Sequence, residues 1–174
     1  MRNPWLFLLL LMLCAPVEAA KPPPMSAQEI ADYVRTNGAK ATVDLLYSGA
    51  RAGEWESVIS HVQSGSSPWV AVAENLATGT DAGTSLDLQV SLALALPMNP
   101  RGVLRLAGTQ GFLSLKDLCG APFIEPSHSY MLKYLKRARR SLQSLHDAAL
   151  QPQKAACLAQ IDKAWLQETT RGKP

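Results

Sequence analysis

The chain has 174 residues, of which 47% are apolar, 18% charged and 6% aromatic. This length suits one domain with a hydrophobic core. The ordinary apolar fraction and the low charged fraction exclude disorder, a collagen-like structure and a nucleic-acid-binding tail for the chain as a whole. The net charge of +3 conceals an asymmetry: residues 20–100 carry four basic and eight acidic side chains, and residues 101–174 carry twelve basic and five acidic ones. Such a split bears on the partners of a protein rather than on its fold.

The first 19 residues are typical of a secretory signal peptide. Arg2 gives a short positive region, residues 5–13 are apolar, and small residues flank Glu18 ahead of a cleavage site after Ala19. The apolar run is too short for a membrane span, which needs about 20 residues, and Leu13 is too large to precede a lipidated Cys14. We therefore predict an exported chain, periplasmic or secreted, with no transmembrane segment after cleavage; an uncleaved anchor is the alternative.

Cleavage would leave two of the three cysteines, Cys119 and Cys157. Two cysteines in an exported chain most often pair, because the compartment is oxidising. The bond would close a loop of about 39 residues, for which the chain-entropy model gives about 3.5–4 kcal/mol. A metal site or a reactive thiol is the alternative, but no CxxC or Cys/His spacing supports a metal. The sequence therefore predicts a disulfide.

The N-terminal part of the predicted domain contains two helices. Residues 20–25 form a proline-rich lead that we expect to be extended, and the domain should comprise residues 26–174. Ser26-x-x-Glu29 is a capping box that starts a helix ending at Asn37-Gly38. Residues 39–47 should form the second helix, with Val43, Leu46 and Tyr47 facing the core.

A motif, W-x-x-V-x-x-x-[VL]-x-x-G, occurs twice at an offset of 14 residues, from Trp55 and from Trp69. Its apolar positions share one helical face, and its glycines, Gly65 and Gly79, suit left-handed positions that follow a helix. The motif predicts two short antiparallel helices, each with a mostly buried tryptophan near its start. Chance similarity between two amphipathic helices is the alternative.

Five further helices are expected. Thr84-x-x-Asp87 resembles a cap before the apolar residues 86–96, whose length and Leu/Ala content favour a buried helix over a buried strand. Short helices should start at Asn99-Pro100 and at Ser114. The longest helix should run from residues 125–127 to about residue 149, and the last one from about residue 153 to residue 167.

The inner faces of the last two helices follow from their helical spacing. The residues expected to face inward are Met131, Tyr134, Leu135, Ala138, Leu142 and Leu145 on the first helix, and Ala156, Cys157, Ile161, Ala164 and Trp165 on the second. No segment alternates with a period of two. The sequence therefore predicts an all-α single domain of about eight short helices, in helix-hairpin, loosely repeat-like packing, closed by a long C-terminal hairpin.

Signatures of catalysis are missing from the sequence. It has no glycine-rich phosphate loop, GxSxG, HExxH or aspartate-rich calcium loop, so we expect no cofactor and no metal. None of the three histidines (His61, His128 and His146) lies at a metal-ligand or triad spacing from a Cys, Asp or Glu. An enzymatic alternative, a small periplasmic hydrolase or lytic accessory enzyme, would have to use Glu54, Glu56 or His61.

A basic run on the long helix suggests a binding surface. Lys133, Lys136, Arg137 and Arg140 share one helical face, with Arg139 beside them. Like charges on one helix repel each other, and an anionic partner would relieve that repulsion. Candidates are an acidic protein, an anionic lipid headgroup or the acidic half of the same chain. Nucleic acid is a poor candidate for an exported protein, and an ordinary solvated face is the alternative.

These features predict a non-catalytic helical binding or interaction protein of the bacterial envelope. In size, export, helicity and one disulfide, the chain resembles small exported helical proteins, including immunity proteins that neutralise toxins of contact-dependent secretion systems, although it has no motif specific to them. An inhibitor or immunity role is thus one form of the prediction, with a protein or another anionic envelope component as the partner. A structural envelope protein is a third hypothesis, and the sequence leaves the oligomeric state open.

Overall fold

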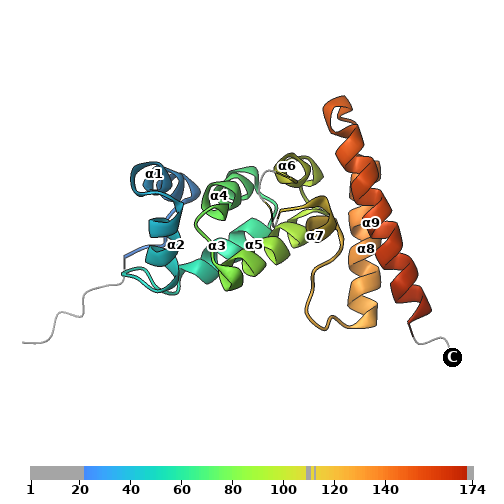
Figure 1. Ribbon diagram of the computed structural model, residues 1–174, viewed down its shortest axis with the longest axis horizontal. Helices are drawn as coiled ribbons and strands as arrows, with labels where there is room; N and C mark the ends of the chain where they lie inside the picture. Colours follow the sequence, from blue (N-terminus) through green and yellow to red (C-terminus); the bar gives the residue numbers. More distant parts are fainter. Residues whose placement is uncertain (1–21, 109–110, 112, 172–174) are drawn as a thin grey trace, which may run out of the picture.

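The computed structural model describes residues 22–108, 111 and 113–171, and all regular structure within these residues is helical. The helices lie along one axis, from α1 and α2 at one end to an upright hairpin of α8 and α9 at the other (Figure 1). The elements are α1 (Ala27–Asn37), α2 (Ala39–Tyr47), α3 (Glu54–Gln63), α4 (Ser67–Ala77), α5 (Ala82–Ala95), α6 (Pro100–Leu106), α7 (Leu115–Cys119), α8 (His128–Gln143), a 3-10 turn η2 (Ala148–Leu150) and α9 (Gln151–Thr170). The all-α prediction is confirmed. The predicted signal peptide, residues 1–19, lies outside the described residues.

Local capping explains where α1 begins. The Ser26 side chain accepts the backbone N–H of Glu29, and the Glu29 carboxylate accepts the N–H of Ser26, so the predicted capping box is present. Donation from the Ser26 hydroxyl, and then from its backbone, holds the pKa of Glu29 below its ordinary value. The helix ends at Gly38, whose φ of +85° is costly for residues with a side chain.

The segment before α1 is attached to the start of α3. The backbone N–H of Met25 donates to the Glu54 carboxylate at 3.1 Å, and the Arg51 guanidinium lies 2.9 Å from the same carboxylate. Arg51 also donates to the carbonyl of Pro23. Glu54 is buried, and its carboxylate connects the segment before α1 to the start of α3.

The two tryptophan motifs form α3 and α4, which pack against each other as predicted, but their glycines differ. Gly65 has a φ of +75°, and a Cβ there would lie 2.7 Å from the Cβ of Met98. Gly79 has no positive φ, and a Cβ there would lie 2.3 Å from the backbone carbon of Ala39. The left-handed prediction is therefore wrong for Gly79, where the requirement is close approach to the start of α2.

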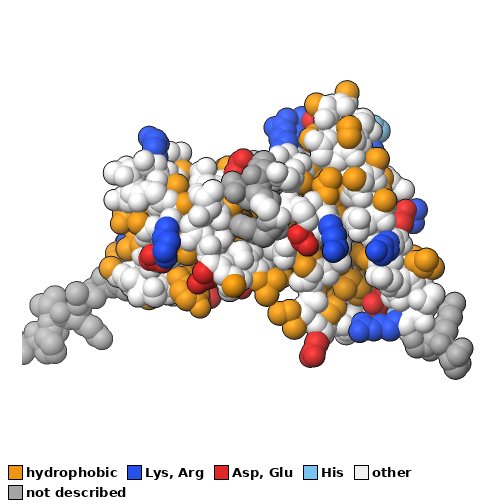
Figure 2. Space-filling model, viewed as in Figure 1, with side chains coloured by type: hydrophobic (Ala, Val, Ile, Leu, Met, Phe, Trp, Pro, Cys, Tyr) orange, Lys and Arg blue, Asp and Glu red, His pale blue; other side chains and the backbone are white. Residues whose placement is uncertain are grey.

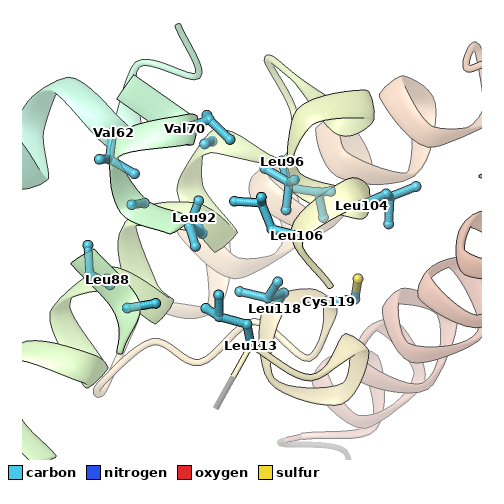
Figure 3. Close-up of a cluster of buried hydrophobic side chains, with 14 of the residues drawn as sticks. Val62, Val70, Leu88, Leu92, Leu96, Leu104, Leu106, Leu113, Leu118 and Cys119 are labelled. Atoms are coloured by element: carbon cyan, nitrogen blue, oxygen red, sulfur yellow. The ribbon is translucent and has the colours of Figure 1, made fainter. Parts of the chain in front are cut away.

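The central helix, α5, contacts α3, α4, α6 and α7. It begins one turn earlier than predicted, because Asp81 is the N-cap and Thr84 is its reciprocal partner. Donation from the backbone N–H and the hydroxyl of Thr84 holds the pKa of Asp81 below its ordinary value. Leu88, Leu92 and Leu96 point into the packed core shown in Figure 3. The helical assignment of this apolar run is confirmed.

One core cluster of apolar side chains extends from Ile30 in α1 to Ile161 in α9, so the described residues form one domain. Three side chains depart from their predicted places. Tyr47 is 54% exposed, Ala156 is exposed and Trp69 is only partly buried. Trp55, at 2% exposure, is buried as predicted.

The last two helices have different limits from those predicted. α8 ends at Gln143, and the longest helix is α9, with 20 residues. Lys154 explains the early end of α8, because its ammonium group donates to the carbonyls of Gln143 and Leu145 at 3.2 and 2.8 Å. Pro152 lies in the first turn of α9, where proline is tolerated, and therefore does not delay that helix.

Candidate functional site

The four basic residues predicted to bind a partner all lie on the exposed face of α8. We call Lys133, Lys136, Arg137 and Arg140 the basic face. The opposite side of α8 is buried, and its core residues are Tyr134, Leu135, Ala138 and Leu142. The helical spacing alone predicted this division.

No carboxylate within the described residues forms an ion pair with the basic face. The adjacent Arg139, in contrast, lies 3.3 Å from Asp162 of α9. Arg137 instead places a guanidinium nitrogen 3.3 Å from the sulfur of Met98. The acidic half of the chain, which was one candidate partner, therefore does not neutralise this face in the structure.

The basic face borders two different hollows. Lys133 and Arg137 line one of about 400 Å³, together with Met98 and Tyr130. Lys136 and Arg140 line another of about 440 Å³, beside Trp165 of α9. The face thus has two sides with different neighbours.

Several contacts hold the hairpin of α8 and α9 in this position. The disulfide between Cys119, at the end of α7, and Cys157, on α9, has a Cα–Cα distance of 5.3 Å, within the usual range for such bonds. Lys154 ties α9 to the end of α8. The Tyr134 hydroxyl donates to the carbonyl of Ala93 in α5 at 2.8 Å. Burial raises the pKa of Tyr134, so its hydroxyl stays protonated and remains a donor.

The three residues of the enzymatic alternative, Glu54, Glu56 and His61, lie in different surroundings in the structure. The Glu54 carboxylate is buried against Arg51, whereas the His61 ring is exposed and stacks on Trp69 with ring centres 4.4 Å apart. Glu56 is exposed and lines a hollow beside Trp55 and Tyr47. These surroundings give no support to a hydrolase centre built from the three side chains.

Sequence reasoning missed an ionisable pair that joins α8 to α9. His128 Nδ1 lies 2.8 Å from the carboxylate of Glu168, a residue buried near the end of α9, and Arg171 lies 3.6 Å from the other carboxylate oxygen. The partners are 40 residues apart, and no local spacing signals their contact. The pair joins the start of α8 to the end of α9 and completes the hairpin.

Comparison with family models, curated proteins and solved structures gives no match. In the described ranges, no group of three or more His, Cys, Asp and Glu side chains is arranged to hold a metal ion. None of the helices in these ranges is long and apolar enough to cross a bilayer.

Proposed function

We propose that this chain is an exported, non-catalytic helical protein of the bacterial envelope that binds an acidic surface of a partner protein. The observation that carries the proposal is the basic face: four exposed cations on one helix, none of which forms an ion pair within residues 22–108, 111 and 113–171. An inhibitor or immunity role is one concrete form of this function.

The energetics of α8 support an external partner. Lys133 and Arg137, like Lys136 and Arg140, are like-charged pairs at i,i+4, and each such pair destabilises a helix by about 0.2–0.5 kcal/mol. A carboxylate-bearing partner would convert this repulsion into attraction and would speed association. The disulfide supports the proposed location, because such bonds persist in oxidising compartments.

The test is capture of partners from an envelope extract of the source cell, at low and high salt. The bait is the mature, disulfide-bonded protein, compared with a variant in which the four cations of the basic face are changed to Gln. We expect the dominant partner to be lost at high salt, because exposed charges are screened over about 10 Å at 0.1 M salt. With purified partner, the variant should associate more slowly and show a flatter salt dependence.

The stability of the four-Gln variant serves as an internal control. Exposed charge contacts contribute about 0–1 kcal/mol each, so the variant should be as stable as the parent or slightly more stable. A variant that binds the partner with the parent's rate and salt dependence would refute the proposed function.

A further inference from the structure

An apolar groove runs between α3, α5 and the N-terminal half of α8. It consists of three adjoining hollows of about 330, 420 and 400 Å³. Gln63 lines all three; Ile59 and Asp87 are shared by the first two, and Leu94 and Tyr130 by the last two. The hollows therefore adjoin one another, and Figure 2 shows hydrophobic side chains along the lower edge of the molecule in this region.

Exposed apolar side chains gather in this apolar groove. Of the large hydrophobic side chains exposed in the described residues, all but Leu166 line it: Tyr47, Leu86, Met98, Ile124 and Tyr130. Ile124 is 77% exposed, the highest value among them. Single exposed apolar residues are ordinary, but a contiguous group of them marks an interaction site.

Contacts between the walls preform the groove. The indole N–H of Trp55 donates to Asp87 at 2.9 Å, which fixes α3 against α5. The ring of Phe123 packs edge-on against Tyr130 and Tyr134, with centres 5.9 and 4.7 Å away, and this holds the linker before α8. A preformed site loses little entropy when a ligand binds.

The two ends of the groove carry opposite charge. Glu56 lies at the α3 end, and Asp87 lies between the α3 hollow and the central one. Lys133 and Arg137 lie at the α8 end. Neither of these two cations forms an ion pair with a carboxylate of the described residues. The contact of Arg137 with the Met98 sulfur places its guanidinium over the apolar groove rather than away from it.

We infer that the apolar groove docks a peptide segment of the partner protein, with apolar side chains at its centre and carboxylates at the end that meets Lys133 and Arg137. This inference rests on the proposed function and adds the chemistry of the recognised segment. Along α5, the groove floor from Leu86 to Leu94 spans about 12 Å, which accommodates about two turns of helix or four extended residues. The acidic α3 end disfavours a carboxylate there, so the segment binds in one orientation.

The test is selection of random 12-residue peptides displayed on phage against the mature, disulfide-bonded protein. The strongest peptides are then synthesised with a fluorophore and titrated by anisotropy. We expect enriched peptides to combine apolar residues with Asp or Glu at one end. Reversing the order of the residues in the best peptide should weaken its binding.

Two double variants on α8 are matched in charge and helical spacing. Lys133→Gln with Arg137→Gln removes the cations that line the apolar groove, and Lys136→Gln with Arg140→Gln removes those beside Trp165. The first should weaken peptide binding by about tenfold, as expected for the loss of charge contacts beside a desolvated site. The second should weaken it clearly less, because its residues line the hollow beside Trp165 and not the groove.

A second matched pair tests the apolar centre. Leu86→Glu places a carboxylate in the groove, and Leu166→Glu places one on α9 outside it. Both side chains are exposed, so both variants should fold. We expect only Leu86→Glu to abolish peptide binding.

Several results would overturn the inference: no enrichment, enriched peptides without carboxylates, or equal binding by all four variants. A parent protein that sediments as a dimer, and becomes monomeric in Leu86→Glu, would assign the groove to a second copy and overturn it too. If the envelope partner is lost by the four-Gln variant but kept by Leu86→Glu, the proposed function stands and the groove inference fails. If the peptide results hold while the four-Gln variant keeps the envelope partner, the proposed function fails separately.

Discussion

The Tyr134 hydroxyl donates a hydrogen bond to the carbonyl of Ala93, and replacing Tyr134 with Phe tests what this bond contributes to stability. In a continuing helix, the carbonyl of Ala93 would accept the N–H of residue 97, but that residue is Pro97 and has none. The Tyr134 hydroxyl supplies the missing donor at 2.8 Å. The Phe variant keeps the ring, 6% exposed and packed against Phe123, and removes only the donor.

The cost can be bounded from the contacts that remain. Leaving a buried carbonyl unsatisfied costs about 1–3 kcal/mol. Ala93 still accepts the N–H of Leu96 at 3.2 Å, which places the expected loss in the lower part of that range, about 1–2 kcal/mol. For a domain of this size, each kcal/mol lowers the melting temperature by about 2–4 °C.

Urea unfolding followed by tryptophan fluorescence measures this free energy, with the slope m as a check on two-state behaviour. Tyr130→Phe is the matched control, because Tyr130 lies on the same helix and is 46% exposed. The control should change stability by less than about 0.5 kcal/mol. Equal stability of parent and Tyr134→Phe would refute the claim that the hydroxyl satisfies a carbonyl left open by Pro97.

Two further predictions concern buried groups. Ellman titration of the denatured, unreduced protein should detect no thiol from Cys119 or Cys157, and two thiols per chain would contradict the disulfide. Reducing the disulfide should lower the free energy of unfolding by about 4 kcal/mol for a loop of this length. Trp55→Ala should destabilise the fold by about 3–5 kcal/mol, and Trp69→Ala by clearly less, because Trp69 is only partly buried; equal losses in calorimetry would show that partial exposure does not lower the contribution of Trp69.

Helix starts were predictable because their signals are local. Ser26, Asn99 and Ser114 each cap a helix by accepting a backbone N–H three residues ahead, and each was identified from its own sequence neighbourhood. Thr84 shows the limit of this reasoning. A capping box is reciprocal, and the sequence alone did not distinguish its first member from its last.

Helix ends were less predictable, because they depend on distant partners. The carbonyl of Gln143, the last residue of α8, accepts from the ammonium group of Lys154, which lies eleven residues further along the chain. The buried Glu168 likewise contacts His128, which lies 40 residues earlier. The periodicity of apolar residues predicts which face of a helix is buried. It does not predict which other helix will contact a given polar group.

The same distinction applies to the candidate site. The exposure of Lys133 and Arg137 followed from spacing along one helix. That no carboxylate of residues 22–108, 111 and 113–171 pairs with them did not follow from spacing, because the fold could have brought any acidic residue of the chain against them. The apolar groove was not predictable at all, since Leu86, Ile124 and Tyr130 come from two helices and a linker that only the tertiary structure brings together.

The charge pattern of α8 gives a final argument for a role beyond folding. Arg139 shows that this helix can neutralise a cation within the chain, through Asp162 of its packing partner. The four cations of the basic face are exposed on the side of α8 opposite its core residues, and the described part of the chain supplies no carboxylate within ion-pair distance of them. The buried face of α8 packs against the core, whereas like charges on the exposed face repel each other. Under the proposed function a binding partner would offset that repulsion, and the four-Gln variant should therefore separate binding from folding.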